Sequence, residues 1–135
     1  MMTKLWTPVT VGRMRLPHRL AMAPMTRDRA LPDGTPGPSA ATYYSQRASM
    51  GLLITEGTQP SDDGQGYLTT PGIYTPAHVE GWRKVVNAVH DAGGRLVIQL
   101  CTSVGCHIRI TRPITANPWH RRRLRPQRRC TRRLA

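Results

Sequence analysis

Three short apolar runs in this 135-residue chain end beside residues that could bind a ligand. Thr26 closes the first run, Gly57 follows the second, and Gln99 stands near the end of the third. A hydroxyl and an amide both donate and accept hydrogen bonds, and a glycine allows another group to approach the backbone closely. By themselves, these residues are also compatible with an ordinary strand-end hydroxyl, a turn glycine and a solvated amide.

A second group of chemically active residues lies in the last quarter of the chain, and its members are Cys101, Cys106, His107, His120 and Cys130. Cysteine and histidine are the usual zinc ligands, but this spacing fits no common ligand pattern. An odd number of cysteines without a secretory signal also gives no disulfide framework. We therefore expect neither a metal site nor a structural disulfide.

The elements that must position the first group alternate along the chain. The apolar runs predict strands at Leu20–Thr26, Leu52–Thr55 and Arg95–Leu100. Helices are expected between them, from Ser39 to Met50 and from Pro76 to the Gly93–Gly94 pair. Such alternation predicts right-handed crossovers and a parallel sheet, with the chemistry at the carboxyl ends of the strands.

Capping residues and turns support this division. Ser39 is expected to cap the first helix, and Gly51 to adopt the left-handed conformation just beyond its end. Thr75 is expected to cap the second helix. Residues 9–16 alternate around Gly12, which predicts a small hairpin before the main fold, and residues 31–38 and 59–74 are expected to be loops.

Charge divides the chain into two parts. Residues 1–100 carry 10 basic and 7 acidic side chains, whereas residues 101–135 carry 10 basic and no acidic ones. Apolar periodicity also stops after Leu100. We expect one partial domain at 1–100, followed by an arginine-rich, irregular and disordered tail at 101–135.

Several motifs in residues 1–100 agree in order and spacing with one enzyme family. They are Met22-Ala23-Pro24-Met25-Thr26-Arg27, Tyr43-Tyr44-Ser45-Gln46-Arg47-Ala48-Ser49, Gly51-Leu52-Leu53-Ile54-Thr55-Glu56-Gly57-Thr58, Gly66-Tyr67, Pro71-Gly72-Ile73-Tyr74, Trp82, His90 and Gln99-Leu100. Together they resemble the N-terminal part of the Old Yellow Enzyme family.

The resemblance implies an α/β fold, the N-terminal portion of a TIM (β/α)₈ barrel with about three βα units. It also implies FMN as cofactor, NADPH or NADH as reductant, and an activated alkene such as an α,β-unsaturated carbonyl compound as substrate. No run approaches the roughly 20 apolar residues of a membrane helix, so we expect a cytoplasmic protein without a membrane partner.

By the same resemblance, six positions contact FMN, and they are Ala23, Pro24, Met25, Thr26, Gly57 and Gln99. The main chain of the first three would lie along the flavin, the Thr26 hydroxyl would bond a flavin carbonyl oxygen, and Gly57 would leave room for the ring. Gln99 would pair with the flavin pyrimidine edge, whose groups alternate between donors and acceptors. Tyr67 matches an aromatic residue that walls the substrate pocket.

The resemblance implies that catalytic groups lie elsewhere. In the family, the side chains that hold the substrate carbonyl, the proton-donating tyrosine and the flavin phosphate site all follow the segment that ends at Leu100. We therefore assign no catalytic residue to this chain, and expect it to be a truncated fragment that is catalytically incomplete and inactive alone.

The family continues after Gln99-Leu100 with Met-His-x-Gly-Arg, whereas this chain continues with Cys101-Thr102-Ser103. If one adenine is restored before the Cys101 codon, the degenerate code permits Met-His-Val-Gly-Arg-Val-Ser-His. The same shift turns Ala, Ser and Pro codons rich in G and C into arginine codons. We hypothesise a frameshift, in the gene or in its reading, near Leu100.

Two other classes of function remain as alternatives. A small basic nucleic-acid-binding protein would use the arginine-rich tail, and a pseudoenzyme would be a non-functional product. Arginine runs bind phosphates without sequence preference, so we expect no specific nucleic acid and only non-specific binding of polyanions by the tail.

Overall fold

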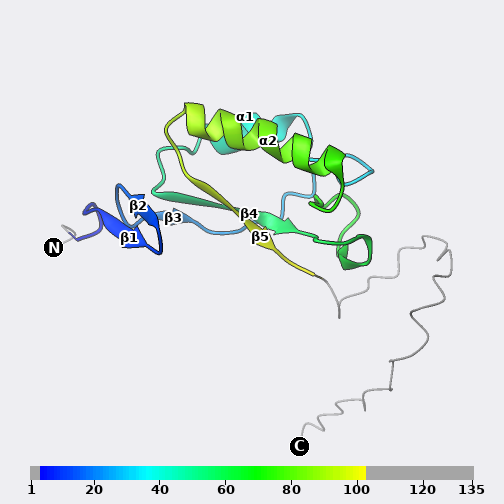
Figure 1. Ribbon diagram of the computed structural model, residues 1–135, viewed down its shortest axis with the longest axis horizontal. Helices are drawn as coiled ribbons and strands as arrows, with labels where there is room; N and C mark the ends of the chain where they lie inside the picture. Colours follow the sequence, from blue (N-terminus) through cyan, green and yellow to red (C-terminus); the bar gives the residue numbers. More distant parts are fainter. Residues whose placement is uncertain (1–3, 103–135) are drawn as a thin grey trace, which may run out of the picture.

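The computed structural model describes residues 4–102 as a parallel α/β unit preceded by a small hairpin (Figure 1). Strands β1 (Val9–Val11) and β2 (Met14–Leu16) pair antiparallel, with Gly12 at φ +57° in the turn, as the alternation predicts. The irregular tail is expected at 101–135, and its residues 103–135, which include most of the rejected zinc ligands, lie outside the described residues, as does the disorder predicted for them.

The main sheet has the strand order β3-β4-β5 and is parallel throughout. Its strands are β3 (Ala21–Met22), β4 (Leu52–Thr58) and β5 (Leu96–Leu100). The predicted parallel sheet is confirmed. Strand β3 is shorter than expected, because its pairing stops at Met22, two residues before Pro24, which lacks an N–H donor. The chain from residue 23 onward is therefore free to leave the sheet.

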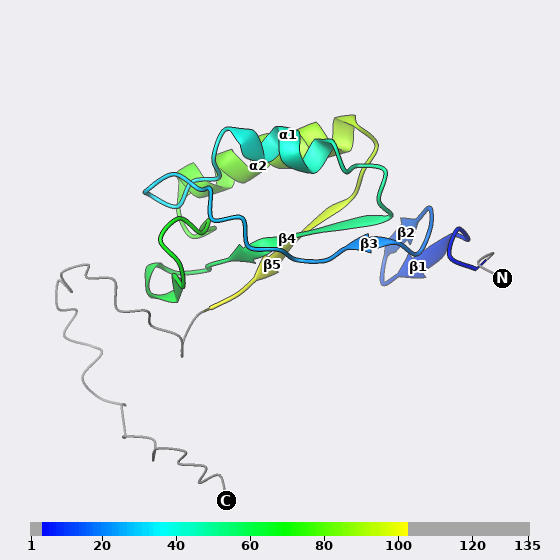
Figure 2. The ribbon, with the colours of Figure 1, turned by 180° about the vertical axis from the view of Figure 1, so that it is seen from behind.

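Both helices lie on the same side of this sheet (Figures 1 and 2). Helix α2 (Pro76–Asp91) begins as predicted, with the Thr75 hydroxyl accepting the backbone N–H of His78 at 3.1 Å. Its apolar face supplies three of the five buried residues of the core, which are Tyr44, Leu53, Trp82, Val85 and Val89. The helical spacing of Trp82, Val85 and Val89 thus positions the helix on β4 and β5.

Helix α1 (Ser39–Ser45) differs from the expectation at both ends. Its N-cap is Pro38, whose φ of −61° already suits a helix, and Ser39 is the first helical residue and makes no capping bond. Gly51 is not left-handed. It is a glycine because a Cβ there would meet the carbonyl oxygens of His18 and Leu20 at 2.5 and 2.9 Å, so the crowding of neighbouring backbone excludes a side chain.

The two long connections are loops, as expected, and the second includes the 3₁₀ helix η1 (Asp62–Gly64). This loop follows the carboxyl end of β4, at the end of the sheet away from the hairpin. No helix in residues 4–102 is long and apolar enough to cross a membrane.

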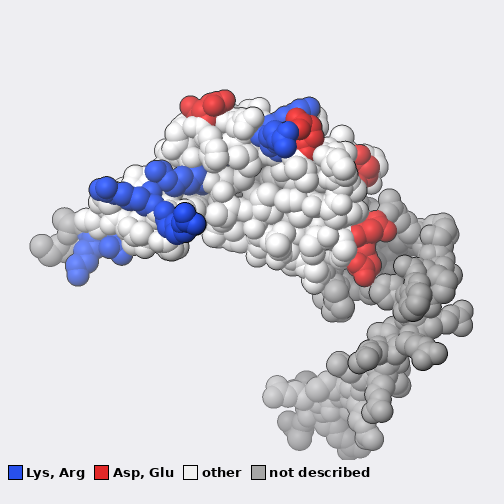
Figure 3. Space-filling model, viewed as in Figure 1, with Lys and Arg blue, Asp and Glu red and all other residues white. Residues whose placement is uncertain are grey.

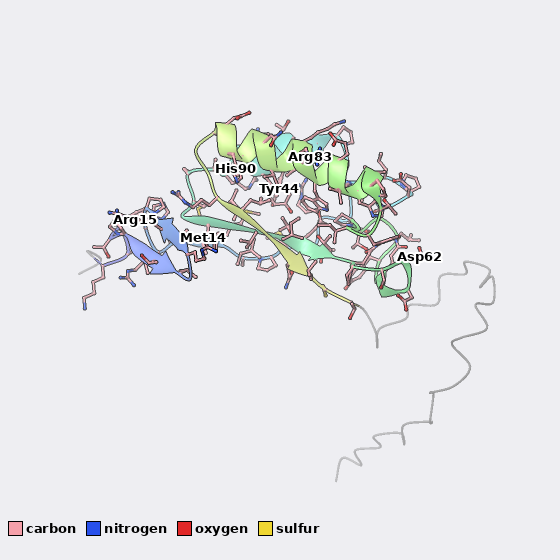
Figure 4. The ribbon with its side chains drawn as sticks, viewed as in Figure 1. Met14, Arg15, Tyr44, Asp62, Arg83 and His90 are labelled. Carbon is pink, nitrogen blue, oxygen red and sulfur yellow. The ribbon has the colours of Figure 1, made fainter. Side chains whose placement is uncertain are left out.

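Charged side chains are unevenly placed on the visible face. Basic residues gather over the hairpin end, whereas an acidic cluster lies at the other end of the molecule (Figure 3). Arg15 and Asp62, labelled in Figure 4, mark these two ends. On this face, the basic patch over the hairpin is therefore remote from the carboxyl ends of the strands.

Candidate functional site

The residues predicted to bind a ligand are brought to one end of the parallel sheet. Residues 23–26 continue directly from β3, Gly57 is the second-last residue of β4, and Gln99 is the second-last residue of β5. All four side chains of residues 23–26 are exposed, with Met25 at 63%. The carboxyl ends of parallel strands are where α/β folds place ligands, so this exposed strip lies where a cofactor is expected.

Gly57 and Gln99 face each other directly across β4 and β5. They are register partners, and the Gln99 Oε1 atom lies 3.9 Å from the position that a Cβ on Gly57 would occupy. The same Cβ would lie 3.1 Å from the Cβ of Cys101. The missing side chain thus avoids a close contact with Cys101, beside an amide that both donates and accepts.

An irregularity in β4 produces this pairing. Ile54 is opposite Val97, but Gly57 is opposite Gln99, so β4 contains one residue more than β5 over this interval. Such a bulge re-aims the side chains that follow it. The Thr55 hydroxyl closes the gap in the ladder, since it accepts the Gln99 backbone N–H at 3.1 Å and donates to the Glu56 carbonyl oxygen at 3.0 Å.

Glu56 is a member of the site that sequence reasoning missed. Its side chain is only 7% exposed, and its Oε2 atom accepts the backbone N–H groups of Arg27 at 2.8 Å and Asp28 at 3.2 Å. The motif Gly51–Thr58 contains Glu56 but gives it no individual role. The available signal was a carboxylate within a strand that begins with the apolar run Leu52–Ile54 and is buried along most of its length.

The loop that carries Tyr67 is tied to the same segment. Tyr67 itself is 55% exposed. Two residues later, Thr69 donates its backbone N–H to Asp28 Oδ1 at 2.9 Å and its hydroxyl to the Asp28 carbonyl oxygen at 2.7 Å. The Tyr67 loop therefore borders the segment that follows Thr26.

These groups fit the ring system of FMN. The site offers exposed residues at 23–25, a hydroxyl at Thr26 and a neutral amide at Gln99, which lies beside Gly57. A flat ring with alternating carbonyl and N–H groups requires this kind of mixed, uncharged donor and acceptor set. No group of three or more His, Cys, Asp or Glu residues in 4–102 is placed to hold a metal ion.

Two histidines of the described part, His18 and His78, hold the scaffold together. His78 is buried, and its Nε2 atom lies 2.8 Å from the carbonyl oxygen of Asp33, to which it donates. His18 makes the same kind of bond to the Ser49 carbonyl oxygen at 2.8 Å. Both histidines thus tie loops to the main fold.

Curated proteins of similar sequence are reductases. A chanoclavine-I aldehyde reductase of Penicillium roqueforti is 50% identical over 101 residues, which cover 73% of this chain and 27% of that protein. The 12-oxophytodienoate reductase 7 of Oryza sativa is 50% identical over 97 residues, covering 71% and 24%. The chain thus spans about a quarter of the length of these relatives.

Solved structures agree with the sequence comparison. Morphinone reductase in complex with tetrahydroNAD superposes with a TM-score of 0.70 at 50% identity, covering 73% of this chain and 27% of that one. The old yellow enzyme homologue from Zymomonas mobilis gives a TM-score of 0.72 at 44% identity, covering 73% and 28%. The described residues therefore have the fold of the N-terminal part of an Old Yellow Enzyme TIM barrel, as the motifs predicted.

A sequence model of one family matches residues 4–125, most of the chain. Its members are FMN-dependent oxidoreductases that use a nicotinamide. The chain belongs to this family, the NADH:flavin oxidoreductase / NADH oxidase family.

Proposed function

We propose that this chain forms the flavin-facing N-terminal part of an NAD(P)H-dependent FMN oxidoreductase that reduces activated alkenes. The observation that carries the proposal is the pairing of Gly57 with Gln99 beside the exposed strip 23–26, at the carboxyl end of the sheet. The names of the relatives, reductases of 12-oxophytodienoate, of chanoclavine-I aldehyde and of morphinone, support a carbonyl-bearing substrate.

Each residue of the candidate site has a distinct proposed role. The main chain of Ala23, Pro24 and Met25 lies along the ring, and Gly57 leaves the space that the ring needs. The Thr26 hydroxyl donates to a ring carbonyl oxygen, and the Gln99 amide pairs with the pyrimidine edge. When bound, FMN accepts hydride from NADH or NADPH and delivers it to the β-carbon of the alkene. Tyr67 forms a wall of the substrate pocket.

The chain supplies only one side of this site in the proposal. Residues 4–102 contain three of the eight strands of a barrel, and the aligned relatives are about four times longer than the matched segment. We propose that the remaining strands supply the groups that bind the substrate, the groups that bind the flavin phosphate and the group that donates a proton. The 135-residue chain alone is then inactive toward alkenes.

The experiment that tests the function uses a hybrid protein, in which residues 4–100 of this chain replace the corresponding segment of morphinone reductase. The 50% identity across the replaced segment makes this exchange conservative. We expect the hybrid to bind FMN and its flavin to be bleached by a nicotinamide without oxygen. A folded hybrid that excludes FMN contradicts the proposal.

Thr26→Ala in the hybrid is expected to lower the flavin reduction potential. The hydroxyl stabilises the negative charge that the ring gains on reduction, and a hydrogen bond contributes about 0.5–1.5 kcal/mol. For a two-electron couple this corresponds to a decrease of roughly 10–30 mV. Thr42→Ala, an exposed threonine of α1, is the control and is expected to leave the potential unchanged. Equal potentials in both variants exclude the proposed bond.

We further propose that residues 101–135 are read out of frame. Support comes from the ten basic residues without a single acidic one, and from the 97–101-residue length of the alignments to curated relatives. The family match nevertheless extends to residue 125, so the nucleotide sequence is decisive. DNA without a family-like reading frame after codon 100 refutes the frameshift.

A further inference from the structure

We propose that Glu56 is a positioning residue, whose buried carboxylate fixes the backbone just after Thr26 and thereby places both the flavin-facing strip and the Tyr67 loop. The link to flavin rests on the proposed function. The anchoring of the backbone by Glu56 follows from contacts within this chain. An experiment can therefore refute the anchoring and the link to flavin independently of each other.

The first support is the geometry of the carboxylate. A single oxygen of Glu56 accepts two consecutive backbone N–H groups, those of Arg27 and Asp28, across 28 or more residues of sequence. Asp28 is the one described non-glycine residue with positive φ, at 54°. That conformation costs an L-residue about 1–2 kcal/mol, so it persists only where contacts hold it. The carboxylate supplies one of those contacts.

The second support is that no side-chain cation competes for this carboxylate. Within residues 4–102, the one ion pair shorter than 4.0 Å joins Arg83 to Glu80 on the surface. The Arg27 guanidinium instead lies 3.2 Å from the centroid of the Tyr43 ring. A buried charge requires compensation, and backbone N–H groups provide it here. The carboxylate therefore acts on the main chain of the strip rather than on another side chain.

The third support is that Glu56 is itself held on both sides. Its backbone N–H donates to the buried hydroxyl of Tyr44 at 3.1 Å, and its carbonyl oxygen accepts from the hydroxyls of Thr55 and Thr58, each at 3.0 Å. Its carboxylate consequently has a defined position relative to the sheet. Asp28 also accepts two hydrogen bonds from Thr69. The carboxylate that holds the Asp28 backbone therefore also fixes where the Tyr67 loop lies.

Amide hydrogen exchange in the full 135-residue chain tests the anchoring without any flavin. We expect Glu56→Ala to increase the exchange rates of the Arg27 and Asp28 amides by about tenfold or more, since each loses its acceptor. Glu56→Gln retains a carbonyl oxygen and is expected to restore protection. Glu56→Asp, one methylene shorter, is expected not to restore it. Glu80→Ala, on the surface, is the control.

This series also distinguishes anchoring from a general loss of folding. The Leu53 amide, which donates to the Arg95 carbonyl oxygen in the sheet, reports whether the sheet itself stays folded. If Glu56→Ala also speeds exchange of the Leu53 amide, the comparison of Glu56→Gln with Glu56→Asp tests the anchoring instead. Wild-type amides at Arg27 and Asp28 that exchange at unstructured rates overturn the proposal. So does equal protection in Glu56→Gln and Glu56→Asp.

The same variants in the hybrid test the link to flavin. Glu56→Ala is expected to weaken FMN binding by about tenfold and to shift the flavin potential, while Glu56→Gln returns both toward wild type. Faster exchange at Arg27 and Asp28 with unchanged FMN affinity and potential overturns the positioning role. A wild-type hybrid that binds no FMN defeats the proposed function, whereas the exchange rates still decide whether Glu56 anchors the strip.

Discussion

Replacing Gln99 with alanine in the hybrid is expected to weaken FMN binding by about tenfold or more. The amide is proposed to make one donor and one acceptor bond to the ring, and each bond contributes about 0.5–1.5 kcal/mol. Loss of both bonds costs about 1–3 kcal/mol, and 1.4 kcal/mol corresponds to a tenfold change in affinity. Quenching of FMN fluorescence during a titration measures the dissociation constant.

The matched control for this prediction is Gln46→Ala. Gln46 is an exposed glutamine at the carboxyl end of α1, so its amide is unrelated to the strand ends. We expect this variant to bind FMN as the unsubstituted hybrid does. The same dissociation constant for both variants would mean that Gln99 lies outside the flavin site.

Tyr44→Phe in the 135-residue chain is expected to lower the free energy of unfolding by about 1–3 kcal/mol. The ring remains in the core, but the Glu56 backbone N–H, which the Tyr44 hydroxyl accepts at 3.1 Å, is left without its partner in a buried region. Urea unfolding measures the loss. Tyr43→Phe is the control, because it keeps the ring against which Arg27 and Arg47 stack.

The same tyrosine predicts a pH dependence. Burial raises the pKa of Tyr44 from 10.0 to about 12, although the hydrogen bond from the Glu56 backbone opposes the rise. Since the folded pKa lies above the unfolded one, the contribution of Tyr44 is complete below pH 10 and is lost as the pH rises through about 12. The stability advantage of wild type over Tyr44→Phe should therefore shrink in that range. A constant difference would contradict the assigned burial.

Short-range signals in the sequence were sufficient for much of the fold. Helix α2 follows from a capping threonine, a first-turn proline and the spacing of its apolar residues, and all of these act within one element. The bounds of α1 were predicted less well, because Gly51 is required by the approach of a distant backbone and not by the end of the helix. A pattern of neighbouring residues cannot predict a contact with the backbone of His18 and Leu20, more than 30 residues away.

The site was less accessible to sequence reasoning than the fold. The bulge at Thr55 and Glu56 becomes visible only when β4 is paired with β5, since it consists of a mismatch between two strands. The role of Glu56 likewise depends on backbone groups 28 and 29 residues away. The roles of Thr26, Gly57 and Gln99 came from the family resemblance, because their residue types are common at strand ends. These roles remain predictions.

The measurement that tests the account most directly is an FMN titration of the purified hybrid beside its parent, morphinone reductase. The replaced segment carries every flavin-facing residue that we assign to this chain. We predict saturable binding, with a dissociation constant within about tenfold of the parent's, because a change of more than 1.4 kcal/mol would require the loss of a ring contact. A hybrid that unfolds cooperatively, and so is folded, yet shows no saturable FMN binding would contradict the flavin site proposed for this chain.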